Sequence, residues 1–266
     1  MILNEIVNGD CIDFLNNEEV EFDAVITSPF YNTNKKAGKG STLTNTDVKE
    51  GQYNYVRYDE FVDVMTNEDY IDFTVKLFKL IDKRLRKNGV VLYNMSYGSE
   101  NTEAMFLAIS GIIENTNFTV ADMIVWKKRS AMPNSSSPNK LTRIVEYIFV
   151  IVRKDEFKSF KSSKKVSSVR KTGQRMYENI FNFIEAPNND GPCPYNKATY
   201  SSDLVEKLID IYINEGDIVY DPFMGSGTTA VACIKKGINY IGTELSEKQC
   251  DWARERIDKL LKEGVK

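Results

Sequence analysis

The stretch V-Y-D-P-F-M-G-S-G-T-T, residues 219–229, decides the fold because it predicts a strand that turns directly into a helix. The apolar residues before Asp221 indicate a buried strand, and residues 228–236 follow a helical pattern. Between them, Gly225 and Gly227 let the backbone turn tightly and approach a ligand. A strand, a glycine turn and a helix in this order indicate half of a nucleotide-binding β-α-β unit.

The next strand supports a nucleoside-bearing cofactor because it ends in Gly242-Thr243-Glu244. A carboxylate at that position suits a bidentate grip on ribose hydroxyls. No Gly-Lys-Ser/Thr of a P-loop follows the glycines, and Thr228-Thr229 replace the third glycine of a dinucleotide fingerprint, which argues against a pyrophosphate. The residues expected at the cofactor are Asp221, Pro222, Phe223, Gly225, Gly227, Thr228 and Glu244.

Outside this unit, apolar runs alternate with helical patterns along the chain. Repeated β-α-β units predict an α/β fold with a mainly parallel, doubly wound sheet and helices on both faces. The runs at 120–126 and 144–152 have no helix between them, so we expect this late pair to be antiparallel. The other strands are expected at 5–7, 22–26, 90–95, 218–220 and 240–242, and the helices at 67–88, 103–114, 203–215, 228–236 and from 246.

Capping signals predict where the helices begin and end. The expected boundary residues are Asn67 and Asn88-Gly89 for the first long helix, Asp203 with Glu206 and then Gly216 for a later one, and Ser246 with Gln249 for the last.

The composition is typical of a soluble globular protein, with 42% hydrophobic and 27% charged residues in a chain of 266. That length predicts one large domain, or one domain with an inserted lobe. The chain has no apolar stretch long enough to span a bilayer and no signal-peptide pattern at its start, so we expect a cytoplasmic protein without membrane contact.

Histidine is absent from the chain, which removes the usual general base, the Ser-His and Cys-His nucleophile pairs and the commonest metal ligand. The four cysteines are scattered without any C-x-x-C pair, so we expect reduced thiols and no metal site. Chemistry in this chain has to depend on positioning, carboxylates or a cofactor.

Positive charge is concentrated in residues 153–175, which contain nine Lys or Arg and two Asp or Glu in a chain of net charge −3. A basic segment on an acidic protein is the pattern of a phosphate-binding face, although a solvated lysine-rich loop has the same composition. The candidate phosphate contacts are Lys158, Lys161, Lys164, Lys165, Arg170 and Lys171, with Lys35, Lys36 and Lys39 in the long loop at 33–57.

A second unusual turn is I-T-S-P-F-Y-N-T, residues 26–33, directly after an apolar run. Pro29 has no amide hydrogen and a fixed φ, so it ends the strand and stiffens the turn. Such a turn holds backbone carbonyls still beside an aromatic face, which suits a flat ring that carries an amino group. An ordinary strand-ending turn remains the alternative at this point.

Together, D-P-F-M-G-S-G-T-T and T-S-P-F-Y resemble the S-adenosylmethionine-dependent DNA amino-methyltransferases of the β arrangement. In that family the catalytic S/D-P-P-Y turn precedes the cofactor loop, which gives a circularly permuted motif order. Residues 126–133 and 146–150 are similar to its late strands. The element N-G-D-C resembles its N-terminal GD motif, which implies that Asp10 and Cys11 lie near the cofactor adenine.

The resemblance implies a Rossmann-like methyltransferase fold with a small target-recognition insert. Residues 1–152 would form the catalytic part, 153–196 the insert and 197–266 the cofactor-binding part. The sequence departs from the family pattern at Phe30, where a second proline is usual, and at Asn196-Lys197-Ala198, where the family has H-P-A.

The resemblance also implies a mechanism that needs no histidine. An oxygen of Ser28 and the Pro29 carbonyl would accept hydrogen bonds from the amino group of a flipped base, while Tyr31 and Phe30 stack on its ring. The amine would then attack the methyl group of S-adenosylmethionine, and no metal takes part. The implied partner is double-stranded DNA.

Several alternatives stay open. Serine at the first motif position favours cytosine N4 over adenine N6 as the target, and a restriction endonuclease companion and a monomeric or homodimeric state are compatible with the resemblance. Rival functions are an NAD(P)-linked oxidoreductase, a methyltransferase for RNA or a protein glutamine, and a non-catalytic nucleic-acid-binding module.

Overall fold

The computed structural model describes residues 2–33, 65–98, 101–131, 133–135, 138–160, 162–196 and 198–264. In chain order its elements are β1 (Glu5–Asn8), α1 (Cys11–Asn17), β2 (Phe22–Thr27), α2 (Asn67–Arg84), β3 (Leu85–Met95), α3 (Ala104–Asn115), β4 (Phe118–Lys128), β5 (Val145–Arg153), the short 3-10 helix η1 (Lys154–Glu156), β6 (Val166–Val169), β7 (Arg175–Tyr177), β8 (Phe183–Ala186), α4 (Ser202–Tyr212), β9 (Ile218–Asp221), α5 (Thr228–Lys236), β10 (Asn239–Glu244) and α6 (Glu247–Glu263).

The centre of the molecule is an eight-stranded sheet in the order β1-β10-β9-β2-β3-β5-β4-β8. β5 runs antiparallel to both of its neighbours, β3 and β4, and the other neighbouring strands pair in parallel. This confirms the predicted mainly parallel α/β sheet with an antiparallel late strand.

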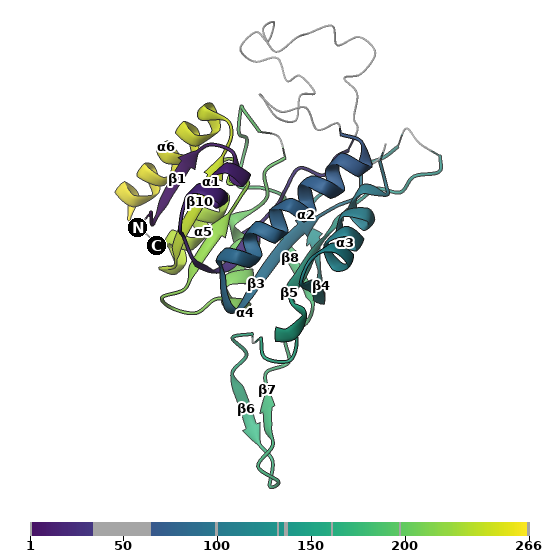
Figure 1. Cartoon of the computed structure of the whole chain (residues 1–266), viewed down its shortest axis with the longest axis vertical. Helices are drawn as coiled ribbons and strands as arrows, with labels where there is room; N and C mark the ends of the chain where they lie inside the picture. Colours follow the sequence, from purple (N-terminus) through teal and green to yellow (C-terminus); the bar gives the residue numbers. More distant parts are fainter. Residues whose placement is uncertain are drawn as a thin grey trace, which may run out of the picture.

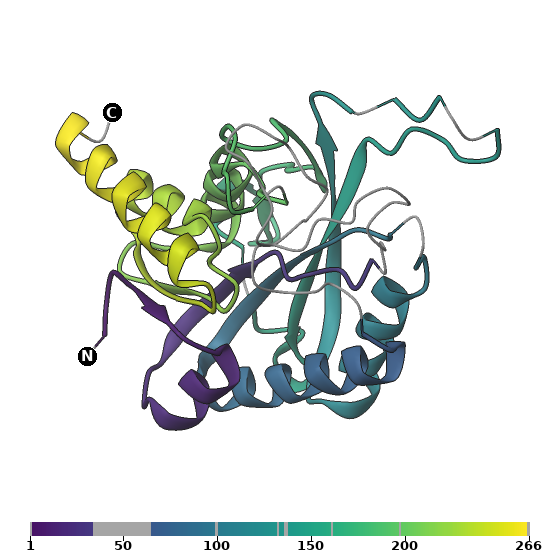
Figure 2. The same cartoon turned by 90° about the horizontal axis from the view of Figure 1, so that it is seen from above.

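Helices cover both faces of the sheet, α1 to α3 on one face and α4 to α6 on the other (Figures 1 and 2). The side chains of a strand alternate between the faces. In β2, Ala24 and Ile26 accordingly pack in the core beneath α4, α5 and α6, whereas Val25 packs in the core beneath α1, α2 and α3. A strand that is buried on both faces is apolar at every position, which explains the continuous run at the end of β2.

β2 and β9 are neighbours at the point where the chain changes direction across the sheet. From β2 the chain passes through α2 to β3 on one side, and from β9 it passes through α5 to β10 on the other. The crossovers diverge at the carboxyl ends of these strands and leave a crevice, which is the usual ligand position in open α/β sheets. Both motifs singled out in the sequence begin there.

Two predicted boundaries around α2 were wrong. Thr66, not Asn67, caps the helix, because its hydroxyl accepts the Asp69 N–H at 3.0 Å. The helix also ends at Arg84, and β3 begins at once because Leu85 pairs with Phe22 of β2. Asn88-Gly89 therefore lies within β3, at an irregularity in the pairing with β2.

The predicted start of α4 was also wrong, since Ser201 is the capping residue and the helix begins at Ser202. The Asp203 carboxylate is instead paired with Lys207 at 2.9 Å. The cap at Ser246 is confirmed, because its Oγ accepts the Gln249 N–H at 3.3 Å. The sequence did not predict α1, which Asp10 caps by accepting the backbone N–H groups of its first turn.

The segment predicted as a target-recognition insert contributes to two sheets. β6 and β7 form a separate two-stranded hairpin, whereas β8 pairs with β4 as the edge strand of the main sheet. The hairpin projects from the lower end of the molecule in Figure 1. Across the described ranges, no helix is both long and apolar enough to cross a membrane.

Candidate active site

Two cavities meet at the catalytic turn predicted from the sequence. The larger cavity, of about 320 Å³, lies over the carboxyl ends of β1, β2, β9 and β10. The smaller cavity, of about 170 Å³, lies over the ends of β2, β4 and the start of β5. Ser28 lines both cavities, and so do Ala198, Thr199 and Tyr200. Ser28 therefore stands where a molecule in one cavity would face a molecule in the other.

Most of the predicted cofactor residues line the larger cavity. Those that do are Asp10, Cys11, Pro222, Phe223, Gly225, Thr228 and Glu244. The sequence did not assign Leu245, Gln249, Met65 or Phe73 to this cavity, which the structure adds to its wall. Asn196 and Ala198, which stand at positions where the family has H-P-A, also line this cavity. Lys197 lies outside the described residues.

The Glu244 carboxylate is held in a fixed orientation at the end of β10. Its Oε2 accepts the Gly225 N–H at 2.9 Å, and its Oε1 accepts the Ser246 N–H at 2.9 Å. Gly225 has a φ of +55°, and a Cβ there would lie 3.3 Å from Asn196 Nδ2. Glycine is therefore needed for the loop to curve around the cavity and to support Glu244.

Two of the residues predicted at the cofactor, Asp221 and Gly227, are not among the described lining residues of the larger cavity. Asp221 is fully buried and does not line the larger cavity. Its Oδ1 accepts from Thr27 Oγ1 at 2.6 Å, and its Oδ2 accepts from Thr229 Oγ1 at 2.5 Å. Burial raises the pKa of the Asp221 carboxyl, and the hydrogen bonds from these threonines oppose the rise. We conclude that Asp221 fixes the conformation of the cofactor loop through its buried hydrogen bonds.

Gly227 is likewise absent from the described lining of the larger cavity, and it packs against α6. A Cβ at this position would lie 2.9 Å from Ala253 Cβ, so the glycine lets α6 approach the start of α5 closely. Its φ of +80° is also one that other residues rarely adopt.

The donor set of the larger cavity fits a nucleoside. Asp10 and Glu244 place carboxylates at the ends of two adjacent strands, where hydroxyl and amino hydrogens of a nucleoside can be bound. Phe223 and Leu245 offer apolar surface for a purine ring. Among the residues of this wall that the structure describes, none is a lysine or an arginine.

The smaller cavity is polar and contains a connected group of side chains around Glu146. Tyr31 Oη donates to Glu146 Oε2 at 2.9 Å, and Lys128 Nζ lies 2.5 Å from Glu146 Oε1. Asn94 Nδ2 lies 2.8 Å from Tyr31 Oη and 2.9 Å from Glu146 Oε2. Ser28 Oγ lies 2.9 Å from Tyr31 Oη, so the catalytic turn is part of this network.

The four residues of the predicted catalytic turn are distributed between the cavities. Ser28 lines both, Tyr31 lines the smaller one, and Phe30 lines the larger one. Pro29 is not among the lining residues of either cavity, so an acceptor role for its carbonyl stays a prediction.

Phe30 was expected to stack on a ring beside Ser28, but it packs on the cofactor side. Its ring centroid lies 5.3 Å from that of Tyr70 and 5.5 Å from that of Phe73. Tyr70 Oη also donates to the Phe30 carbonyl at 2.7 Å. This bond holds the backbone at the position where the family has its second proline.

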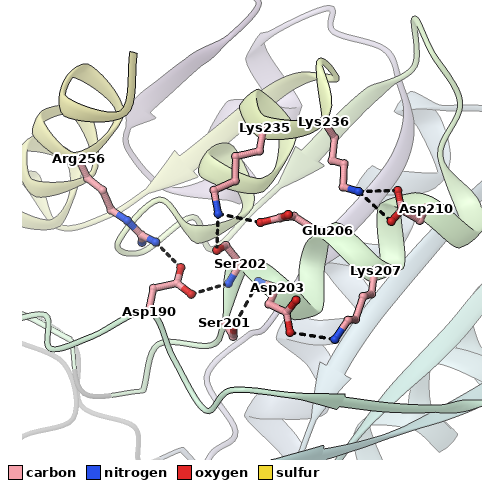
Figure 3. Close-up of polar contacts among 10 residues, drawn as sticks. All are labelled: Asp190, Ser201, Ser202, Asp203, Glu206, Lys207, Asp210, Lys235, Lys236 and Arg256. Carbon is pink, nitrogen blue, oxygen red and sulfur yellow. Dashed lines mark hydrogen bonds and ion pairs between the residues drawn. The ribbon is translucent and has the colours of Figure 1, made fainter. Parts of the chain in front are cut away.

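The described residues in 188–200 contribute to the walls of both cavities, and this segment is attached to the cofactor loop. Asp190 accepts the Ser202 N–H at 2.8 Å and pairs with Arg256 of α6 (Figure 3). Arg256 also donates to the Ser226 carbonyl at 3.2 Å. Asn188, two residues before Asp190, lines the smaller cavity, so one arginine links the lining of that cavity to the glycine loop.

The predicted DNA-binding cations that the structure describes lie far from this site in the fold. Lys35, Lys36, Lys39 and Lys161 are outside the described residues. The others belong to the segment around the β6–β7 hairpin, namely Lys158, Lys164, Lys165, Arg170 and Lys171. Ser159 bonds to Asn88 at 2.6 Å, and the Ser163 N–H bonds to the Ile211 carbonyl at 2.5 Å, which places this segment at the amino ends of the parallel strands. The catalytic turn is at the opposite, carboxyl ends.

A different basic loop stands at the catalytic end. Residues 129–144 join β4 to β5 and contain Arg129, Lys140 and Arg143 without any acidic residue. Asn134 bonds to Thr142 Oγ1 at 3.0 Å and to the Lys140 carbonyl at 3.0 Å, which fixes part of the loop. Figure 2 shows this loop extending away from the body of the molecule.

Comparison with known proteins decides the family. The family model for N6/N4-type DNA methylases, described as DNA methylase, matches residues 22–255. The chain belongs to this family. S-adenosylmethionine is the methyl donor of its members, and the larger cavity has the residues to hold it. Membership of this family excludes two of the alternative functions, an NAD(P)-linked oxidoreductase and a non-catalytic binding module.

Individual relatives agree with this membership. The orphan methyltransferase M.BamHII of Bacillus amyloliquefaciens is 29% identical over 205 residues, which cover 65% of this chain and 76% of that protein. The crystal structure of the M1.HpyAVI-SAM complex matches with a TM-score of 0.57 and 22% identity, over 95% of this chain and 97% of that one. The cytosine-N4-specific PvuII DNA methyltransferase matches with a TM-score of 0.65 and 17% identity, over 94% of this chain and 85% of that one. These structural likenesses support the Rossmann-like methyltransferase fold.

Sequence reasoning missed Lys128 and Glu146, which line the smaller cavity, and Asn94, which hydrogen-bonds to Tyr31 and Glu146 beside it. The overlooked signal was polarity at the ends of buried strands. Asn94 interrupts the apolar run of β3, and Glu146 is a lone carboxylate in the apolar run of β5. Polar side chains that are buried in this way need partners, so they indicate a site.

Proposed function

We propose that this DNA methyltransferase transfers a methyl group to the exocyclic amino group of a flipped base, with cytosine N4 as the target atom. The observation that carries the proposal is the position of Ser28 in the lining of both cavities. A base in the smaller cavity would present its amino group to the larger cavity at this residue. No other side chain of the predicted catalytic turn lines both.

The chemistry of the amine explains what Ser28 has to do. The lone pair of an exocyclic amine is delocalised into the ring, which makes the amine a poor nucleophile. A hydrogen bond from the NH2 group to Ser28 Oγ draws that hydrogen out of the ring plane and localises the lone pair on nitrogen. The bound cofactor supplies an electrophilic methyl group. Ser28 then contributes by holding the amine in the attack geometry, a positioning effect that can supply much of the rate.

Proton transfer does not require a dedicated base in this scheme. The amine becomes acidic only after it has gained the methyl group, so its proton can leave afterwards. The absence of histidine from the chain is consistent with this order of events. Tyr31, whose hydroxyl is tied to Glu146, presents its ring to the cavity as a surface on which the base can stack.

The position of the site also restricts where DNA binds. A base inside a duplex cannot reach Ser28, so the target nucleotide has to flip out, at a cost of a few kcal/mol. The duplex therefore lies against the carboxyl ends of the strands, near the loop at 129–144. Phosphate contacts by the predicted lysines of 158–171 stay a prediction, as do the boundaries of the recognition insert, the cytoplasmic location, a restriction endonuclease companion and the oligomeric state.

Cytosine N4 is favoured by Ser28 at the first motif position and by the likeness to a protein that is named as cytosine-N4-specific. The test is to methylate unmodified DNA with labelled S-adenosylmethionine, digest it to nucleosides and identify the product by mass. We expect N4-methylcytosine. N6-methyladenine would overturn the choice of base, and label in RNA or in no nucleic acid would overturn the proposed function.

A further inference from the structure

The ion pair between Lys128 and Glu146 lies in the wall of the smaller cavity. The proposed methyl transfer by Ser28 does not by itself require this ion pair. We infer that Lys128 binds the ring edge of the target base beside its amino group, and that Glu146 is the positioning residue for both Lys128 and Ser28. This inference rests on the proposed function, because it assigns residues that recognise the base within the same site.

The strand register places the two side chains side by side. Trp126 of β4 is opposite Glu146 of β5, and Lys128 is two residues further along β4, on the same face as Trp126. Lys128 and Glu146 are thus diagonal neighbours across the strands. The Lys128 side chain is 24% exposed and that of Glu146 is 10% exposed, so the pair is largely withdrawn from water. Removing one partner from such a pair leaves an uncompensated charge.

The ammonium group of Lys128 has N–H donors that Glu146 does not accept. A lysine ammonium carries three N–H donors, and Glu146 accepts one of them. In the described part of the chain, no second acceptor for this ammonium is found. Its nitrogen also lies 5.1 Å from the centre of the Trp126 ring, which helps to hold it over the cavity. A ligand in the cavity can therefore accept up to two hydrogen bonds from Lys128.

The arrangement matches the hydrogen-bonding edge of cytosine. That edge presents a donor, the N4 amino group, followed by two acceptors, ring N3 and O2. Ser28 supplies the acceptor for the amino group, and Lys128 supplies donors for the two acceptors. The corresponding edge of adenine has only one acceptor, N1, next to its amino group, and then a C–H. The donor set of the cavity thus favours cytosine independently of the motif.

Glu146 also decides which atoms of the network donate. An ionised carboxylate can only accept hydrogen bonds, so the Tyr31 hydrogen points to Glu146 Oε2 at 2.9 Å. The Tyr31 oxygen then acts as an acceptor, both for Asn94 Nδ2 at 2.8 Å and for the Ser28 hydroxyl over the 2.9 Å contact. Ser28 Oγ also accepts a hydrogen bond from Asn94 Nδ2 at 3.2 Å, and its second lone pair is available for the amine. Glu146 therefore makes Ser28 an acceptor, which is the property that the mechanism needs.

The test for Lys128 is a double-mutant cycle between the enzyme and its substrate. Wild type and Lys128→Met are assayed by single turnover on a duplex with cytosine at the target and on the same duplex with 3-deazacytosine, which keeps the amino group but has C–H in place of N3. We expect Lys128→Met to be about 100-fold slower on cytosine, and clearly less impaired on 3-deazacytosine. Each comparison is made on one substrate, so any change in the intrinsic reactivity of the analogue cancels.

Lys127→Met is the matched control because Lys127 points to the other face of β4 and pairs with Glu185 at 2.7 Å. It should methylate both duplexes at the wild-type rate. Equal fold-losses for Lys128→Met on the two substrates would show that Lys128 does not contact N3, and a near-normal rate on cytosine would also overturn the inference.

The positioning role of Glu146 has a separate readout. Glu146→Gln keeps the shape, but its amide can donate to Tyr31 and so reverse the network. We expect single-turnover methylation to fall about 100-fold while the affinities for S-adenosylmethionine and for DNA stay at the wild-type values. Adding Tyr31→Phe to this variant should cause little further loss, because Tyr31 transmits the effect. Additive losses, or a weaker cofactor affinity in Glu146→Gln, would contradict the role.

Failure of the inference is distinguishable from failure of the proposed function. If wild type methylates cytosine but the cycle shows no coupling, the inference alone is wrong. If wild type methylates adenine, the choice of base is wrong, and the same cycle with 1-deazaadenine then tests Lys128.

Discussion

Thr27 Oγ1 donates a hydrogen bond of 2.6 Å to Asp221 Oδ1, and this bond joins the two central strands at their carboxyl ends. The two residues are 194 positions apart in the sequence. The catalytic turn begins one residue after Thr27, and the cofactor loop begins at Asp221. A single buried contact thus fixes the turn that holds the base relative to the loop that holds the cofactor.

The raised pKa of Asp221 predicts how Asp221→Asn changes the pH dependence of stability. The folded protein holds the proton of this carboxyl more tightly than the unfolded chain, whose carboxyl has the ordinary value of 3.8. The stability that this group contributes is therefore fully present below that value and is lost as the pH rises through the raised pKa. The free energy of unfolding of wild type relative to Asp221→Asn should fall over this window in denaturant titrations at a series of pH values. A relative stability that increased with pH would mean that the hydrogen bonds outweigh burial.

Ser28→Ala should separate methyl transfer from cofactor binding. The substitution removes the acceptor for the amine but no group that Glu244 or the glycine loop needs. We expect the single-turnover rate to fall about 10²- to 10³-fold, with an unchanged affinity for S-adenosylmethionine by calorimetry. Ser168→Ala, in the exposed strand β6, is the control. Normal turnover in Ser28→Ala would remove the catalytic assignment.

Glu244→Gln should weaken the cofactor affinity. The amide can accept only one of the two backbone hydrogen bonds, from Gly225 and Ser246, that the carboxylate accepts, and it lacks the charge. Loss of a charged hydrogen bond costs about 1.5–3 kcal/mol, or roughly a factor of 10 to 100 in the dissociation constant. Glu247→Gln, three residues further and exposed, should bind normally. Equal affinities for the two variants would exclude Glu244 from the site.

The salt dependence of DNA binding should distinguish the two basic regions. Each phosphate contact contributes about 0.9 to the slope of log affinity against log salt. We expect the paired change Lys140→Ala with Arg143→Ala, at the catalytic end, to reduce this slope more than Lys164→Ala with Lys165→Ala at the hairpin. A larger effect at the hairpin would place DNA at the amino ends of the strands and favour the assignment made from composition.

The sequence predicts the fold well where the signals are local. Apolar runs, the glycines around Ser226 and the serine cap of α6 each act within a few residues, and the structure confirms the elements that they predict. The boundary errors at Asn67 and Asp203 came from neighbouring hydroxyl residues, Thr66 and Ser201, which compete as caps. Such a choice depends on where the chain enters the helix, and no pattern in the sequence gives that direction.

The candidate site was predictable only where a motif carries it. Lys128 and Glu146 are brought together by the antiparallel register of β4 and β5, across a loop of 16 residues at 129–144. Phe30 turns toward the cofactor side because Tyr70, Phe73 and Phe223 form an aromatic pocket there. Both outcomes depend on contacts between distant parts of the chain, which local patterns do not encode.

The central claim is that the amine becomes reactive because Ser28 holds it at the junction of the two cavities. A crystal structure of the protein with DNA and a non-reactive analogue of the cofactor tests this most directly. We predict that the amino nitrogen of a flipped cytosine lies within hydrogen-bond distance of Ser28 Oγ, about 2.7–3.2 Å, and faces the cofactor sulfur position. A target base whose amine points away from Ser28 would contradict the account.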